Sequence, residues 1–204
     1  MTTPLRTARS LLALFALLCA GYVGARANAQ KRRAAETEVL RALLDSAYSY
    51  ILPGSIPRAR ELLLTDHFDE LHGWYWIDSV AHWVADTLPD VSRDLIRDFS
   101  RVAPDQSRIE PFELGRSKLH LLADSTLGRF FRRAGSGWDG FYRAFPNGGA
   151  IVSVSRVGLS RDCRWAMVYA GSQGDWLAGA GYLYVLEKHG GVWHERRRLM
   201  LWIS

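Results

Sequence analysis

The densest group of side chains that could do chemistry lies in the stretch DHFDELH, residues 66–72. Carboxylates and imidazoles bind divalent metal ions and transfer protons in hydrolases, and this stretch contains Asp66, His67, Asp69, Glu70 and His72. His67 and His72 are five residues apart, which on a helix turns them about 140° from each other, and no HExxH motif is present. A polar connection between two elements is the favoured interpretation. A metal site made of Asp66, His67, Asp69 and His72 is the alternative.

Other catalytic patterns are missing from the sequence. The stretches AGSQG and AGSGW lack the first glycine of a G-x-S-x-G nucleophile turn. The loop GSQGDWLAGAG lacks the lysine and the Ser/Thr of a phosphate-binding loop, and it precedes a predicted strand instead of a helix. Serine-hydrolase chemistry and nucleotide binding are therefore not expected, and no cofactor is predicted.

Arg156 is the first binding candidate, because it interrupts the apolar run SVSRVG. On a strand it shares a face with Val152 and Val154, where an unpaired buried charge would be costly. We expect a structural brace between Arg156 and a carboxylate. The alternative is an arginine that recognises an anion.

Asp175 and Trp176 are the second binding candidate, in the middle of the glycine-rich loop. Glycines there permit positive φ in a long hairpin loop, which is the favoured interpretation. An exposed aromatic side chain that contacts a partner is the alternative.

Residues 1–29 have the layout of a secretory signal peptide. Basic residues come first, an apolar run spans residues 11–23, and Ala27-Asn28-Ala29 fits a cleavage site before Gln30. The apolar run is shorter than the ~20 residues of a spanning helix. The sequence therefore predicts export to the periplasm or the exterior. An uncleaved segment that anchors the protein to a membrane is the alternative.

Removal of residues 1–29 also changes the charge. The 26 basic residues fall to 23 against 21 acidic ones, so the formal charge falls from +5 to +2. This small charge gives little attraction to phosphate, and no nucleic-acid partner is expected. Cys163 is then the only cysteine, which excludes an internal disulfide. No histidine adjoins it, so a structural cysteine is favoured over a catalytic one.

The spacing of apolar residues predicts the elements of the remaining chain. Helices are expected over 34–52, 73–88, 89–103, 124–130 and 138–145, and strands over 59–66, 116–124, 150–159, 164–170, 181–188 and 192–203. Short links join most of the last four strands, which is typical of an antiparallel meander. The expected fold class is α+β, with N-terminal helices packed on a mostly antiparallel sheet of five to six strands. Residues 30–204 would form one domain, helix-rich over 34–145 and ending in a four-stranded meander over 150–203.

The stretches WDGFYRAFPNGGAIVSVSRVGLS, AMVYAG, GAGYLYVLEKHGGVW and LMLWIS resemble a group of exported bacterial proteins of uncharacterised function. The resemblance covers roughly residues 138–204, and more loosely the helix at 90–102. It implies export and a shared C-terminal antiparallel sheet, and it implies no activity. In that group the glycine-rich loop often contains cysteines, whereas the loop GSQGDWLAGAG of this chain has none.

These observations favour an exported, non-enzymatic binding or interaction module whose partner is a protein or a small ligand. The alternative is an exported hydrolase with an acid and histidine site near residues 66–72. Membrane contact is expected only through an uncleaved signal segment.

Overall fold

The computed structural model describes residues 26–46, 61–69, 83–84, 86–133, 135–175 and 178–204. The chain divides into two compact units, Met1–Glu36 and Thr37–Ser204. Most of the predicted signal segment, and most of the helix predicted over 73–88, lie outside the described residues. None of the helices in the described part of the chain is long and apolar enough to cross a membrane.

The first described helix covers residues 26–46, so it begins earlier than the predicted 34–52, whose last residues, 47–52, lie outside the described part of the chain. In the second unit it buries Val39, Leu40, Leu43 and Leu44 on one side, at the spacing of an amphipathic helix. Its polar side forms an ion pair from Glu38 to Lys188, with 2.7 Å between Oε2 and Nζ.

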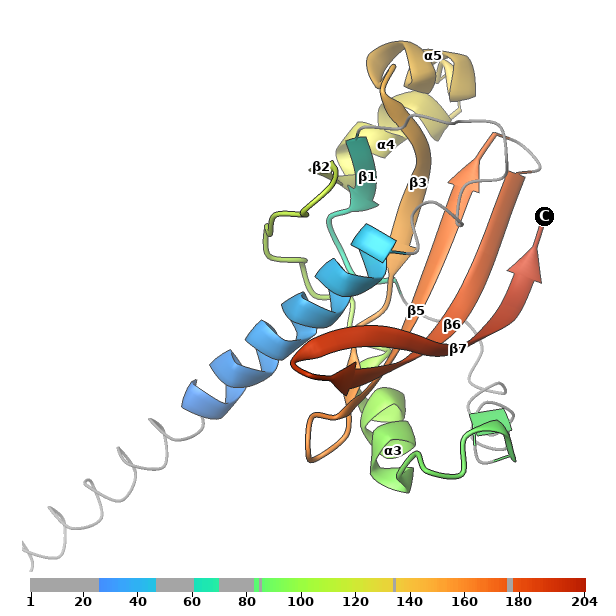
Figure 1. Ribbon diagram of the computed structural model, residues 1–204. Helices are drawn as coiled ribbons and strands as arrows, with labels where there is room; N and C mark the ends of the chain where they lie inside the picture. The colour runs from blue at the N-terminus through green and yellow to red at the C-terminus, as the bar shows by residue number, and fades with distance from the viewer. Residues whose placement is uncertain (1–25, 47–60, 70–82, 85, 134, 176–177) are drawn as a thin grey trace, which may run out of the picture. The chain divides into compact units, whose positions relative to one another are not determined.

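The second unit contains one mixed sheet (Figure 1). Its strands are β1 (Glu61–Thr65), β2 (Lys118–Leu122), β3 (Gly148–Val154), β4 (Gly158–Leu159), β5 (Trp165–Gly174), β6 (Ala178–His189) and β7 (Val192–Ile203). The order is β2-β1-β3-β5-β6-β7, and β4 pairs with β5. β1 is parallel to β2 and β3, whereas β3 to β7 pair antiparallel. The α+β class is confirmed.

Two details of the predicted sheet were wrong. Within the described residues it has seven strands instead of five or six, because the predicted strand 150–159 is interrupted at residues 155–157 and continues as β4. It is mixed because helical connections return the chain to the same end before β2 and before β3, so these strands pair in parallel with β1.

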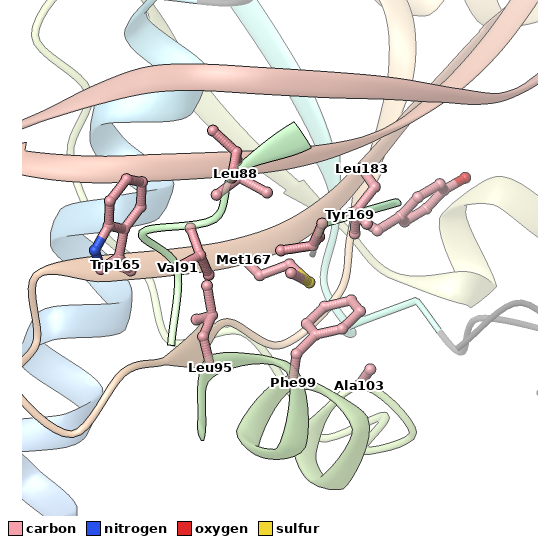
Figure 2. Close-up of a cluster of buried hydrophobic side chains, with 11 residues drawn as sticks. Leu88, Val91, Leu95, Phe99, Ala103, Trp165, Met167, Tyr169 and Leu183 are labelled. Atoms are coloured by element: carbon pink, nitrogen blue, oxygen red, sulfur yellow. The ribbon is translucent and has the colours of Figure 1, made fainter. Parts of the chain in front are cut away.

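Helices α3 (Arg93–Val102), α4 (Asp124–Phe131) and α5 (Gly137–Ala144) pack on one face of the sheet, which we call the helical face. Helix α3 packs Leu95 and Phe99 on Met167 and Tyr169 of β5 (Figure 2). Helices α4 and α5 cover Leu63 of β1 in a second cluster, which includes Leu122, Trp138 and Phe141. The register links the two clusters, since Leu63 lies beside Ile151 and β3 pairs with β5.

Two acids of α3 join the helix to the strands through backbone groups. Asp98 accepts the N–H of Leu159 at 2.8 Å, and Asp94 accepts the N–H of Arg161 at 2.7 Å. Gly158 lets α3 approach this closely, because a Cβ there would lie 2.6 Å from the Cα of Phe99. The stretch SRVGLS therefore provides part of the surface on which α3 packs.

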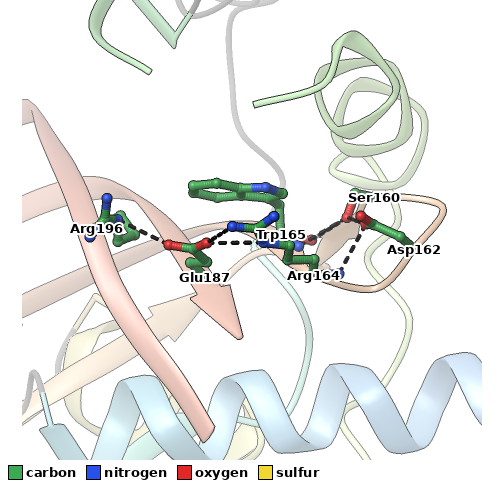
Figure 3. A network of polar contacts seen from close by, with 6 residues as sticks. All are labelled: Ser160, Asp162, Arg164, Trp165, Glu187 and Arg196. Atoms are coloured by element: carbon green, nitrogen blue, oxygen red, sulfur yellow. Dashed lines mark hydrogen bonds and ion pairs between the residues drawn. The ribbon is translucent and has the colours of Figure 1, made fainter. Parts of the chain in front are cut away.

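A buried carboxylate near the end of β6, that of Glu187, links the three strands of the β5–β6–β7 meander (Figure 3). Glu187 is 6% exposed and accepts two hydrogen bonds from Arg164, at 3.0 and 2.6 Å. Its second oxygen lies 3.2 Å from Nε of Arg196 on β7. The hydrogen bond and charge of Arg164 hold the pKa of Glu187 below its usual range, against the effect of burial. Arg196, one of the three consecutive arginines on β7, therefore links β7 to β6.

Gly158→Ala is expected to lower the free energy of unfolding by roughly 1–3 kcal/mol, because the added methyl group must displace α3. Urea denaturation measures the change. Gly174→Ala on β5 is the matched control, since its Cβ would meet no atom closer than 3.3 Å. Equal stability of the two variants would contradict the close packing of α3.

Candidate functional site

A pocket of about 370 Å³ lies on the helical face, where the three parallel strands end. Its walls are formed by Thr65, His67, Phe68, Asp69, Gln106, Asp124 and Ser153. Thr65 ends β1, Asp124 follows the end of β2, and Ser153 lies near the end of β3. The carboxyl ends of parallel strands are the usual place for ligands in open sheets that contain helices.

Backbone hydrogen bonds hold the segment after β1 in an extended path. The N–H of Asp66 donates to Leu122 at 3.0 Å, and the N–H of Asp69 donates to Val154 at 2.7 Å. Between them, Phe68 donates to Ser107 at 3.1 Å. The segment is therefore bonded to β2, to β3 and to the stretch around residue 107. Its side chains Thr65, His67, Phe68 and Asp69 line the pocket.

The acid and histidine cluster of the sequence is partly brought together. His67 and Asp69 both line the pocket, and Asp66 Oδ1 lies 2.6 Å from His67 Nδ1. His72 and Glu70 lie outside the described residues. Asp124 joins the cluster, and its carboxylate falls within 4.8 Å of the ligand atoms of Asp66 and His67.

Sequence reasoning missed Asp124 and Ser153. Asp66 directly follows β1 and Asp124 lies two residues after β2, so both come to the same edge of the sheet once the two strands are known to be parallel. Ser153 shares the helical face because it lies opposite Gly171 in the register of β3 and β5. Both signals depend on the pairing of strands far apart in the chain.

A hydrogen-bonded chain of side chains leads from β7 to the pocket. The indole N–H of Trp202 donates to the hydroxyl oxygen of Tyr169 at 3.0 Å, and Tyr169 is hydrogen-bonded to Ser153. Ser153 Oγ donates to Asp69 Oδ2 at 2.8 Å. Because Ser153 has one hydroxyl proton and donates it to Asp69, the Tyr169 hydroxyl donates to Ser153, and every donor in the chain points toward Asp69. The chain therefore favours a carboxylate at its pocket end.

Two glycines make room for this chain. Ser153, Gly171, Gly181 and Trp202 are successive cross-strand partners on β3, β5, β6 and β7. A Cβ at Gly171 would overlap the Tyr169 hydroxyl, and one at Gly181 would overlap the indole of Trp202. The two aromatic side chains therefore occupy the space that side chains at 171 and 181 would otherwise fill.

Arg156 braces the wall behind the pocket. Its Nη1 lies 2.8 Å from Asp105 Oδ2 and 3.0 Å from Ser107 Oγ, and its guanidinium lies 4.9 Å from the ring centre of Phe68. Burial acts to raise the pKa of Asp105, but hydrogen bonds from Ser107 and the charge of Arg156 bring it below its usual range. Arg156 thus forms the carboxylate brace that the sequence favoured.

Asp175, the other binding candidate in the described part of the chain, is not among the residues that line the pocket. Asp175 has a positive φ of 63° at the end of β5, and its charge, together with burial, raises the pKa of Tyr142 on α5. Trp176 lies outside the described residues. Cys163 is partly buried, with a positive φ of 54°, in the turn between Ser160 and Arg164.

Arg156→Met is expected to destabilise the protein and to leave pocket binding intact, because the brace lies behind Phe68. A double-mutant cycle with Asp105→Asn, measured by urea denaturation, is expected to give a coupling of about 0.5–1.5 kcal/mol, since Asp105 is about half exposed. Additive effects would argue against the brace. Loss of ligand affinity in a stable Arg156→Met variant would favour anion recognition instead.

Tyr169 gives a prediction at alkaline pH. Burial raises its pKa from 10.0 to about 12. Between these values the folded protein keeps a proton that the unfolded chain has lost, so the free energy of unfolding falls as pH rises. Tyr169→Phe is expected to reduce that fall by about 2 kcal/mol, measured by denaturation at pH 9 and 12. Burial also raises the pKa of Tyr184 to about 12, so Tyr184→Phe is expected to behave in the same way. If the free energy of unfolding of Tyr169→Phe fell between pH 9 and 12 as much as that of the unmodified protein, the raised pKa of Tyr169 would be contradicted.

No protein-family model, curated protein or solved structure matches this chain, and the resemblance of residues 138–204 to exported bacterial proteins stays a prediction.

Proposed function

We propose that the protein is an exported binding module whose ligand is a small, uncharged, polyhydroxylated molecule held in the pocket. The observation that supports this most is the chemistry of the pocket wall. Two carboxylates, Asp69 and Asp124, line it together with the amide of Gln106, and among the described residues its lining contains no lysine or arginine. Such a wall offers mainly hydrogen-bond acceptors, which suit the hydroxyl groups of a ligand and repel anions.

The size and rigidity of the pocket agree with this class of ligand. A volume of about 370 Å³ lies at the small end of ligand pockets. Asp69 is held by Ser153, and Phe68 adds an apolar wall that is backed by Arg156. Because these groups are fixed before a ligand arrives, less conformational entropy is lost on binding.

An exported hydrolase is the second candidate. It is favoured by the placement of His67, Asp69 and Asp124 around one pocket, since an imidazole and carboxylates can divide the roles of general acid and base. Release of product from neutral glycosides or esters, lost in Asp69→Asn, would support this candidate over simple binding.

Three sugars of one ring size test the proposed ligand class, with EDTA present to exclude metal effects. We expect glucose to bind at least about tenfold more tightly than glucuronate, because Asp69 and Asp124 repel the carboxylate. Glucosamine reports the effect of a positive charge. Isothermal titration calorimetry or chemical shift changes give the affinities.

Asp69→Asn is expected to reduce the difference in affinity between glucose and glucuronate. Asp90→Asn, an exposed acid before α3, is the matched control and should leave it unchanged. Tighter binding of glucuronate than of glucose, or binding of none of the three sugars, would overturn the proposal.

A further inference from the structure

The carboxylates of Asp66 and Asp124 and the imidazole of His67 converge at the edge of the pocket. One ligand atom from each lies within 4.8 Å of the other two. His67 and Asp124 also line the pocket, whereas Asp66 is mostly buried behind them, with 14% of its side chain exposed. The three groups come from the ends of two parallel strands, so the sheet itself sets their separation.

Two atoms of this group are buried and make no hydrogen bond, which is a second observation beside the convergence of the three side chains. Asp66 Oδ1 and His67 Nδ1 lie 2.6 Å apart, yet the contact does not have the geometry of a hydrogen bond, and neither atom has another partner. Buried polar atoms are almost always paired, because an unpaired one keeps the full cost of its desolvation. A carboxylate oxygen and an unprotonated imidazole nitrogen at this distance repel each other unless a proton or a metal ion lies between them.

We propose that Asp66, His67 and Asp124 bind a divalent transition-metal ion of the zinc type. One imidazole nitrogen with two carboxylates suits Zn²⁺, Co²⁺ or Mn²⁺ better than Ca²⁺ or Mg²⁺, which prefer oxygen ligands alone. Three protein ligands leave further positions for water or a ligand, as in catalytic zinc sites. Since His67 and Asp124 line the pocket, these open positions face it.

The backbone holds two of the three ligands in place before any ion arrives. Asp66 donates its N–H to Leu122 and accepts the N–H of Ile109 at 2.8 Å. Asp124 is the first residue of α4, whose first turn is closed by a bond from Leu127 N–H to Ala123 at 3.1 Å. Asp69 differs from the three ligands, because its Oδ2 already accepts the Ser153 hydroxyl. The metal set therefore replaces Asp69 of the sequence-based alternative with Asp124.

Calorimetric titration of the metal-stripped protein with Zn²⁺, and absorption spectra with Co²⁺, test the site. We expect saturable binding of one ion and a Co²⁺ spectrum typical of low coordination number. Loss of groups behind the ligands already weakens metal affinity by about 10- to 100-fold, so His67→Gln and Asp124→Asn are each expected to weaken it by about 100-fold or more. Asp124 is exposed, so its variant is expected to fold normally.

Asp69→Asn is the matched control, because it changes a pocket carboxylate outside the metal set and should leave the Zn²⁺ affinity intact. No saturable binding by the unmodified protein, or equal affinity in the folded His67→Gln and Asp124→Asn variants, would overturn the metal site. The site does not depend on the proposed sugar ligand: Zn²⁺ binding without sugar binding supports it, whereas sugar binding without Zn²⁺ binding overturns it.

Discussion

The pocket depends on the hydrogen bonds that extend β1 beyond Thr65. Asp66 bonds to the end of β2 and Asp69 to the end of β3, so four consecutive residues are fixed against three separate parts of the chain. Without these bonds His67 and Asp69 would lie on an ordinary surface loop, and their acidity and spacing would have no consequence. The parallel pairing of β1 with β2 and β3 therefore determines both the place and the chemistry of the site.

The sequence predicted most elements because their signals are local. The apolar stripe of Leu95 and Phe99 predicted α3, and the alternation after Ala150 predicted the strands of the meander. The short strands β1 and β2 were also located, but their parallel pairing with β3 was not. Direction in a sheet depends on how the connecting helices return the chain, and periodicity contains no information on that path.

The candidate site was predicted only in its contiguous part. Asp66, His67 and Asp69 were visible as a cluster because they lie within four residues. Asp124 and Ser153 join them through strand register, over separations of more than fifty residues. Arg156 shows the opposite case. A charge in an apolar strand predicts that a partner exists, although only the fold identifies Asp105 as that partner.

The two glycines beneath the aromatic side chains have a consequence for how this protein can vary. An alanine at 171 would take the space of the Tyr169 hydroxyl, and one at 181 would take that of the Trp202 indole. Each pair of positions must therefore change together if the hydrogen-bonded chain is to survive. Among natural relatives, we expect glycine at 171 to accompany tyrosine at 169, and a larger residue at 171 to accompany a shorter side chain at 169. Such paired changes would be a record of selection acting on the chain of hydroxyl groups that ends at Asp69.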